Sequence, residues 1–186
     1  AVAILEKALE EHSENATLIS YLGLYTGMSA GRTTDFTEAG RLANRSFQLL
    51  DRAVSLEPDN PEILMNRGII YVNVPEFLGK MNTGIEDLEM AASIISESPD
   101  EFSSGRQIAV WTHLGEAYRK INSHDKAITA WEEIMEISPG SSQAERARKE
   151  IEKLSAQKEK LKKQSSEAPT PESSRMISRG REAYMN

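Results

Sequence analysis

An ordered series of large and small residues between Trp111 and Pro139 most constrains what this chain can fold into. The first half of the series has large residues three, four and seven positions apart, the spacing of one face of a helix. The second half repeats this spacing and ends at a proline, which cannot continue a helix. The series is Trp111, Leu114, Gly115, Tyr118, then Ala127, Trp131, Ile134 and Pro139. It predicts two antiparallel helices that approach closely where Gly115 meets Ala127.

Weaker copies of the same series precede this one in the chain. One copy has Leu64, Gly68 and Tyr71 followed by Gly84, Leu88 and Ala91, and Arg67 stands where a leucine is expected. An earlier copy has Ile19, Leu22 and Gly23 followed by Ser46, Leu50, Ala53 and Pro58, with Thr26 in the tyrosine position. A half copy has Ala1, Leu5 and Ala8. The sequence therefore predicts repeated helix pairs, with residue 1 inside a repeat.

This pattern resembles the tetratricopeptide repeat (TPR) family. The resemblance implies an all-α fold, a TPR-like right-handed α-α superhelix (solenoid) with a C-terminal capping helix. It divides the chain into a repeat array over residues 1–141, a capping helix over 142–164 and a flexible tail over 165–186. Within the array we expect a half-repeat at 1–13 and repeats at about 14–58, 59–96 and 106–141.

The copies are spaced more widely than the TPR period of about 34 residues, so the chain must contain insertions. Gly23 and Ser46 are 23 residues apart, whereas the equivalent Gly115 and Ala127 are 12 apart. The predicted insertions are loops at residues 29–37, 74–79 and 97–105, with a new helix beginning near residue 37. In the second insertion, Phe77 and Leu78 form a lid or a partner contact in one interpretation and a hydrophobic plug in another.

The segment after residue 141 differs from the array in charge. Residues 142–163 carry eight Lys and Arg against four Glu, whereas residues 1–141 carry a net charge of −11. Ser142 and Glu145 have the spacing of a capping box, and apolar residues follow at helical steps. We expect a solvated terminal helix, with a short coiled coil as the rival interpretation. The net charge of the whole chain, −7, argues against a nucleic-acid partner.

The sequence contains few residues that could perform catalysis. It has no cysteine and three histidines, and it lacks the HExxH, GxGxxG and Walker patterns. His113 and Glu116 could share a helix face, but one such pair does not make a metal site. Long apolar runs such as residues 68–72 are too short to span a membrane. We therefore expect no enzyme activity, no cofactor and no bound metal.

The resemblance also implies where a ligand would bind. In TPR arrays the first helices of the repeats line a concave groove. Carried onto this chain, the groove residues are Tyr21, Leu24, Met65, Asn66, Ile69, Asn73, Thr112, His113, Glu116, Arg119 and Lys120. The expected function is that of a non-catalytic scaffold that binds a peptide or protein segment in this groove. The chaperone-tail clamp of some TPR domains is disfavoured, because only Asn66 matches it and Ser20, Leu24, Ala109 and His113 do not.

Two other functions stay open at this point. One is a small-molecule or lipid carrier in which the insertions close the groove. The other is a self-assembling adaptor, because Leu5 and Leu9 lack a covering helix if the first helix has no partner. An insertion or the tail could also cover Leu24, Met65 and Ile69.

Overall fold

The computed structural model describes residues 1–167 of the 186-residue chain, and their regular structure is entirely helical. The α-helices are α1 (Val2–Glu11), α2 (Ala16–Ala30), α3 (Phe36–Leu56), α4 (Pro61–Tyr71), α5 (Met81–Glu97), α6 (Ser104–Lys120), α7 (His124–Ile137) and α8 (Ser142–Glu167). Two 3-10 turns, η1 (Glu76–Leu78) and η2 (Pro99–Glu101), complete them. The all-α prediction is confirmed for this part of the chain. Helix α8 ends three residues beyond the predicted 164, and the remainder of the predicted tail lies outside the described residues.

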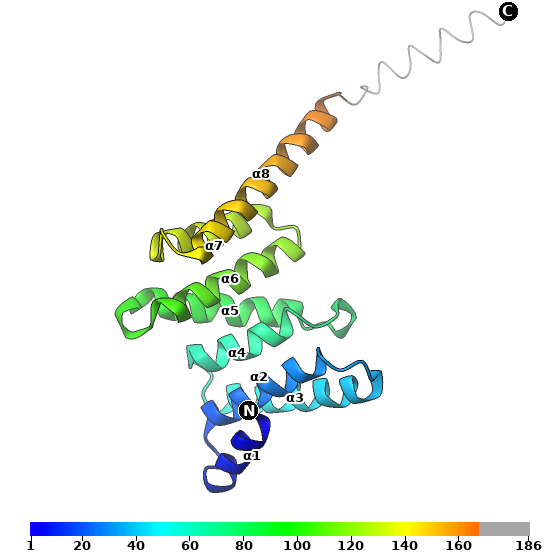
Figure 1. Ribbon diagram of the computed structural model, residues 1–186, viewed down its shortest axis with the longest axis vertical. Helices are drawn as coiled ribbons and strands as arrows, with labels where there is room; N and C mark the ends of the chain where they lie inside the picture. Colours follow the sequence, from blue (N-terminus) through cyan, green and yellow to red (C-terminus); the bar gives the residue numbers. More distant parts are fainter. Residues whose placement is uncertain (168–186) are drawn as a thin grey trace, which may run out of the picture. The chain divides into compact units, whose positions relative to one another are not determined.

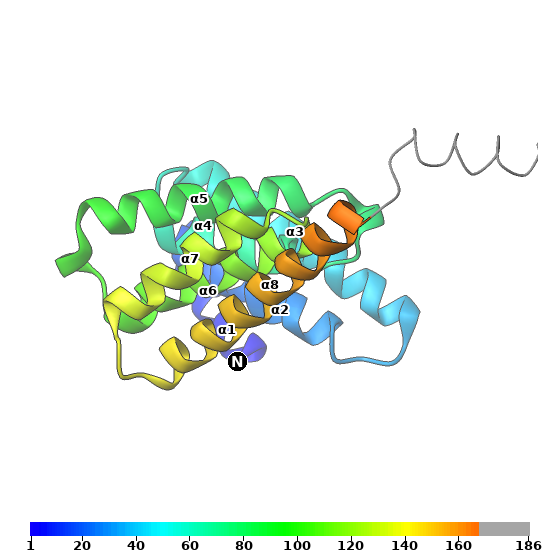
Figure 2. The ribbon, with the colours of Figure 1, turned by 90° about the horizontal axis from the view of Figure 1, so that it is seen from above.

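Helices α2 to α7 form three antiparallel pairs, as Figures 1 and 2 show. Helix α2 packs on α3, α4 on α5, and α6 on α7, while α2 also contacts α4 and α5 contacts α6. Helix α1 packs on α2. The paired helices all belong to one compact unit, Ala1–Arg148, whereas most of α8 lies outside it.

Polar residues just before the helices fix where several of them begin. The side chains of Asn15, Asp35, Asn60 and Ser103 each accept a hydrogen bond from a backbone N–H in the first turn of the following helix. These bonds satisfy donors that have no partner inside the helix. The predicted capping box at Ser142 is wrong by one residue, because the Ser141 hydroxyl accepts from the Ala144 N–H at 3.1 Å.

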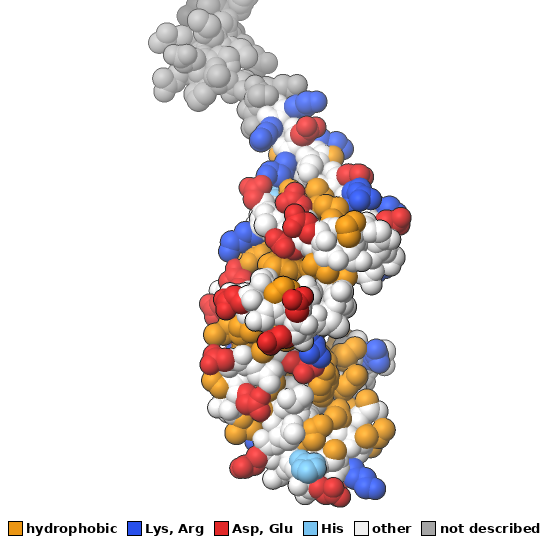
Figure 3. Space-filling model, turned by 90° about the vertical axis from the view of Figure 1, so that its left-hand side faces the viewer, with side chains coloured by type: hydrophobic (Ala, Val, Ile, Leu, Met, Phe, Trp, Pro, Cys, Tyr) orange, Lys and Arg blue, Asp and Glu red, His pale blue; other side chains and the backbone are white. Residues whose placement is uncertain are grey.

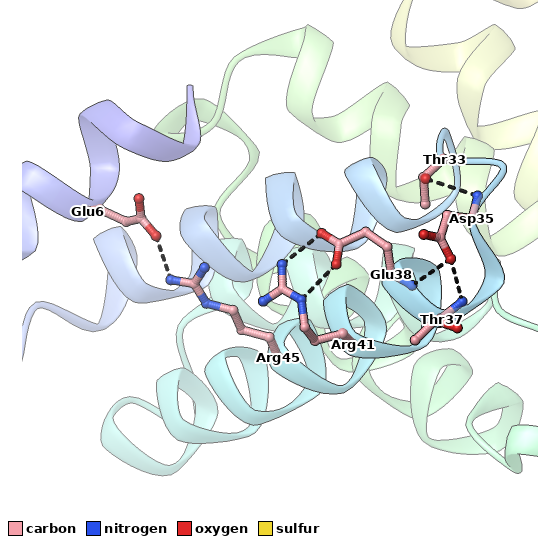
Figure 4. A network of polar contacts seen from close by, with 7 residues as sticks. All are labelled: Glu6, Thr33, Asp35, Thr37, Glu38, Arg41 and Arg45. Atoms are coloured by element: carbon pink, nitrogen blue, oxygen red, sulfur yellow. Dashed lines mark hydrogen bonds and ion pairs between the residues drawn. The ribbon is translucent and has the colours of Figure 1, made fainter.

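The first insertion is only partly a loop. Its residues 29–30 extend α2 and residues 36–37 begin α3, which leaves Gly31–Asp35 as the connection. Figure 4 shows how α3 is held: Asp35 accepts from the Thr37 and Glu38 N–H groups, and Arg41 pairs with Glu38. The predicted loop over 29–37 is therefore too long, since both helices grow into it.

Helix α1 is held against α3 by the ion pair of Glu6 with Arg45, at 2.6 Å (Figure 4). Leu9 packs on the buried cluster of Ala16, Ile19, Ala53 and Ile63. Leu9 is thus covered in part and stays half-buried, and self-assembly through Leu5 and Leu9 stays a prediction. The exposed apolar residue of α1 is Ile4, which is 74% exposed, and Leu5 is half-buried.

Glycines allow the paired helices to approach closely. A Cβ atom on Gly115 would lie 2.2 Å from the indole nitrogen of Trp131, which is buried. The three atoms nearest to that position all belong to Trp131, four residues after Ala127, and the predicted contact of Gly115 with Ala127 stays a prediction. A Cβ on Gly68 would lie 2.9 Å from the carbonyl oxygen of Gly84. The interfaces of α6 with α7 and of α4 with α5 leave no room for a methyl group.

Arg67, which departs from the repeat pattern, forms a half-buried ion network. Its guanidinium donates to both carboxylate oxygens of Asp87, at 2.7 and 2.8 Å, and to Asp51 at 3.0 Å. The Tyr71 hydroxyl also donates to Asp51, and burial raises the pKa of that tyrosine. Arg67 therefore connects α4 to both α3 and α5, where leucine would contribute only apolar contacts.

Two exposed phenylalanines lie at the connections between paired helices. Phe36, after Gly31–Asp35, is 92% exposed, and Phe77, in η1, is 85% exposed. Both connections lie on the right-hand side of Figure 1. Gly79 follows η1 with a φ of 65°, a conformation that suits glycine. Phe77 and Leu78 are exposed in this structure, so the plug that the sequence left open is not formed.

Candidate binding face

Helices α2, α4 and α6, the first helices of the three pairs, are joined to one another and carry the predicted groove residues. We call their shared surface the first-helix face. Its apolar side chains are Leu24, Met65 and Ile69, all half-buried. Leu24 also packs on the buried cluster of Leu50, Ile70 and Tyr71. The face thus presents apolar surface that is neither fully covered nor fully exposed.

A buried hydrogen bond joins α2 to α4. The Asn66 side-chain amide donates to the Ser20 hydroxyl oxygen at 3.0 Å, and the Ser20 hydroxyl donates to the Thr17 carbonyl. Asn66 is 2% exposed and Ser20 is fully buried. Asn66 therefore links two repeats, and a ligand that lies on the surface does not reach its amide.

A second contact joins all three first helices near their N-terminal ends. The Tyr21 hydroxyl donates to the carboxylate of Glu62, and the Arg106 guanidinium donates to the same oxygen at 2.6 Å. The hydrogen bond to Glu62, together with burial, raises the pKa of Tyr21. Tyr21 thus stays protonated and keeps its donor on Glu62 at neutral pH.

A third contact joins α6 to the C-terminal end of α4. The Lys120 ammonium donates to the Val72 carbonyl at 2.7 Å and to the Asn73 side-chain oxygen at 2.8 Å. The Asn73 amide donates to the Ile69 carbonyl. Burial lowers the pKa of Lys120 from its ordinary value, the Glu116 carboxylate opposes this shift, and the nearby Arg119 charge adds to it. Both hydrogen-bond partners of Lys120 are neutral, and the carboxylate that acts on its charge is that of Glu116, one turn earlier on α6.

The other predicted groove residues lie on α6. The Thr112 hydroxyl donates to the Ile108 carbonyl of its own helix, and the side chains of Glu116 and Arg119 are exposed. Glu62 and Arg106 were not among the predicted site residues. The sequence did contain a pattern that could have predicted this pair: Glu62 and Arg106 are an acid and a base near the start of successive first helices, and they form an ion pair between the repeats.

His113 is a half-buried residue of α6 whose Nδ1 has no hydrogen-bond partner among the described residues. Burial lowers its pKa, the Glu116 carboxylate opposes this shift and the Lys120 charge adds to it. Imidazole in unfolded chains has a pKa of about 6.5. The unfolded state therefore binds more protons than the folded state as the pH falls through this value.

We expect the chain to lose stability as the pH falls from 7 to 5, and His113→Gln to reduce that loss. The contribution of His113 is fully present above pH 6.5 and decreases below it, by at most about 1.4 kcal/mol per pH unit. Urea unfolding at pH 7, 6 and 5 measures the slope. His12→Gln is the matched control, since His12 is exposed and should leave the slope unchanged. Equal slopes for wild type and His113→Gln would contradict the prediction.

Within the described residues, no three His, Asp or Glu side chains are grouped so that they could hold a metal ion. None of the described helices is long and apolar enough to cross a bilayer.

Comparisons with known proteins agree with this geometry. No family model matches the sequence. The chain is 31% identical over 113 residues to Superkiller protein 3 of Saccharomyces cerevisiae, a match that covers 59% of this chain and 8% of that protein. The chain thus spans less than a tenth of the length of this relative. The crystal structure of MamA matches with a TM-score of 0.52 and 21% identity, over 87% of this chain and 89% of that chain.

The paired helices and their stacked first-helix face define a helical-repeat protein. The two similarities support the TPR resemblance, and the fold is that of a TPR-like helical solenoid.

Proposed function

We propose that this chain is a non-catalytic interaction scaffold that binds a peptide or protein segment on the first-helix face. The TPR-like relatives support the broad role of a protein-interaction scaffold. Binding on the first-helix face is supported by the partly exposed apolar surface of Leu24, Met65 and Ile69. The helices that carry these residues are connected by polar contacts.

The polar contacts matter because they fix the shape of the face before a ligand arrives. Each connects a different pair of positions: Ser20 with Asn66, Glu62 with Arg106, and Val72 and Asn73 with Lys120. A preorganised surface loses less conformational entropy on binding than a mobile one. Ligand side chains can therefore gain from apolar contact with Met65 and Ile69 without first ordering the protein.

Peptide selection tests this proposal directly. A phage library of 12-residue peptides is selected against the wild type, and the selected peptides are then measured against variants. We expect Met65→Glu/Ile69→Glu to weaken binding at least tenfold, because the added carboxylates interrupt the apolar surface. Met65→Ala is the milder variant and should weaken binding about threefold. Leu24 is left unchanged because it also packs on the core.

Met90→Glu is the matched control, since Met90 lies on α5 and is 46% exposed. It makes the same kind of change away from the first-helix face and should leave binding unchanged. Thermal unfolding establishes that each variant is folded. Failure to select any peptide on the wild type would contradict the proposal, and so would equal loss of binding in Met90→Glu.

A further inference from the structure

The charges of the repeat array are divided unequally between its two sets of helices. The second helices α3, α5 and α7 contain four Lys and Arg against ten Asp and Glu, a net charge of −6. The first helices α2, α4 and α6 contain four cations against two anions, and α2 contains no charged residue at all. Figure 3 shows acidic side chains spread over one face of the molecule. The first helices are therefore the non-acidic part of an acidic array.

The cations of the first helices are not equivalent. Arg67 is engaged with Asp87 and Asp51 of the second helices, and Arg106 is paired with Glu62. Two cations remain, Arg119 and Lys120, both at the C-terminal end of α6. The Arg119 side chain is exposed and makes no hydrogen bond or ion pair with the described residues.

Lys120 is held in place by neutral partners. An ammonium group has three N–H donors, and the Val72 carbonyl and the Asn73 side chain accept two of them, at 2.7 and 2.8 Å. One donor is left for a ligand, and the ammonium position is already fixed. Glu116 is the only carboxylate on α6, and it too is exposed. An anion that approaches this end of α6 meets two cations for one carboxylate.

Apolar surface lies next to this charge. Asn73, which lies two residues beyond the end of α4 and accepts from Lys120, donates to the carbonyl of Ile69 in the last turn of α4. A ligand side chain that packs against Ile69 would thus lie close to a ligand carboxylate that binds Lys120. The chaperone-tail clamp would require cations at the positions of Ala109 and His113. The cations of this face, Arg119 and Lys120, stand at other positions of the helix, so this site differs from the clamp.

We propose that the segment bound on the first-helix face carries an internal Asp or Glu close to an apolar anchor, with the carboxylate on Lys120 and Arg119 and the anchor on Met65 and Ile69. This inference rests on the proposed peptide-binding function. A side-chain carboxylate is favoured over a chain terminus because the positions that hold a terminal carboxylate in the chaperone-tail clamp are occupied here by Ala109 and His113. The charge of Arg119, which no ion pair neutralises, adds attraction over a longer range.

The test uses the same 12-residue phage library, in which each peptide is fused to the coat protein and has no free C-terminus. We expect the selected peptides to share an Asp or Glu at a fixed distance from an apolar residue. Replacing that acid by its amide should weaken binding at least tenfold at 50 mM salt. Raising the salt to 500 mM should weaken binding of the acidic peptide but not of its amide variant, because salt screens exposed charges.

Protein variants locate the contact. Lys120→Gln and Arg119→Gln should each reduce affinity about fivefold, and Arg119→Gln carries the test if Lys120→Gln perturbs the contact of α6 with α4. Lys126→Gln, on α7, removes an exposed cation that pairs with Glu89 and should have no effect. Synthetic peptides with an amidated C-terminus should bind as well as those with a free carboxylate.

The outcomes separate this inference from the function on which it rests. If no peptide is selected, the peptide-binding function fails. If peptides are selected but are neutral or basic, or bind Lys120→Gln and Arg119→Gln as tightly as wild type, the function stands and the acidic preference is refuted. Binding that requires a free C-terminus would refute the internal carboxylate.

Discussion

Replacing Arg67 by leucine is expected to lower the free energy of unfolding by about 3 kcal/mol, although leucine is the residue that the TPR resemblance favours there. The Arg67 and Asp87 side chains are only 16% and 6% exposed, so the substitution leaves the Asp87 carboxylate buried without its cation. A buried charge that loses its partner costs more than the pair contributed. Urea unfolding followed by circular dichroism measures the loss.

The double variant Arg67→Leu/Asp87→Leu is the informative control. It removes both charges, so most of the lost stability should return, because apolar residues can replace a buried ion pair at little cost. Asp51 keeps a hydrogen bond from Tyr71 and has half its side chain in solvent, so it tolerates the change. A double variant as unstable as Arg67→Leu would show that Arg67 acts through packing and not through its charge.

Gly115→Ala is expected to destabilise the chain by about 3 kcal/mol, the upper part of the range for overpacking a core. The new methyl group would lie 2.2 Å from Nε1 and 2.5 Å from Cδ1 of Trp131, well inside van der Waals contact. Trp131 is 3% exposed and has little space into which it can move. Helices α6 and α7 must therefore separate, and thermal unfolding should report a lower midpoint.

Gly105→Ala, on the same helix, separates this steric effect from helix propensity. A Cβ on Gly105 meets no atom within 4 Å, so the added methyl should stabilise α6 by about 0.5 to 1 kcal/mol. Opposite signs for the two alanine variants are the expected result. A loss of stability in both would indicate that glycine is needed for a reason other than the contact with Trp131.

The periodic apolar residues were sufficient to predict the paired helices. The positions of Leu64, Gly68 and Tyr71 on α4 and of Leu88 and Ala91 on α5 are all buried, as the spacing required. Helical spacing is a local property, so it can be read from the sequence without knowing which helices meet. The cap at Ser141 instead of Ser142 shows the usual uncertainty at helix ends.

Contacts between distant residues were not predictable in the same way. The sequence shows that Arg67 departs from the pattern, but Asp51 and Asp87 become its partners only when α3 and α5 pack on either side of α4. Asn66 was predicted to line the ligand groove, whereas its amide is buried on Ser20, 46 positions away. The chemistry of a polar residue depends on which neighbours its helix faces, and spacing along one helix does not determine them.

The short connections beside Phe36 and around Phe77 have a practical consequence for protein engineering. Gly31–Asp35 and the turn around η1 join paired helices at one edge, and a Cβ on Gly31 or Gly79 would meet no side chain of another helix. Lengthening a surface connection costs little, since the closure entropy grows slowly with length. A fluorescent reporter or a grafted recognition loop can therefore be inserted beside Thr34 or Phe77 while the packed helices keep their register.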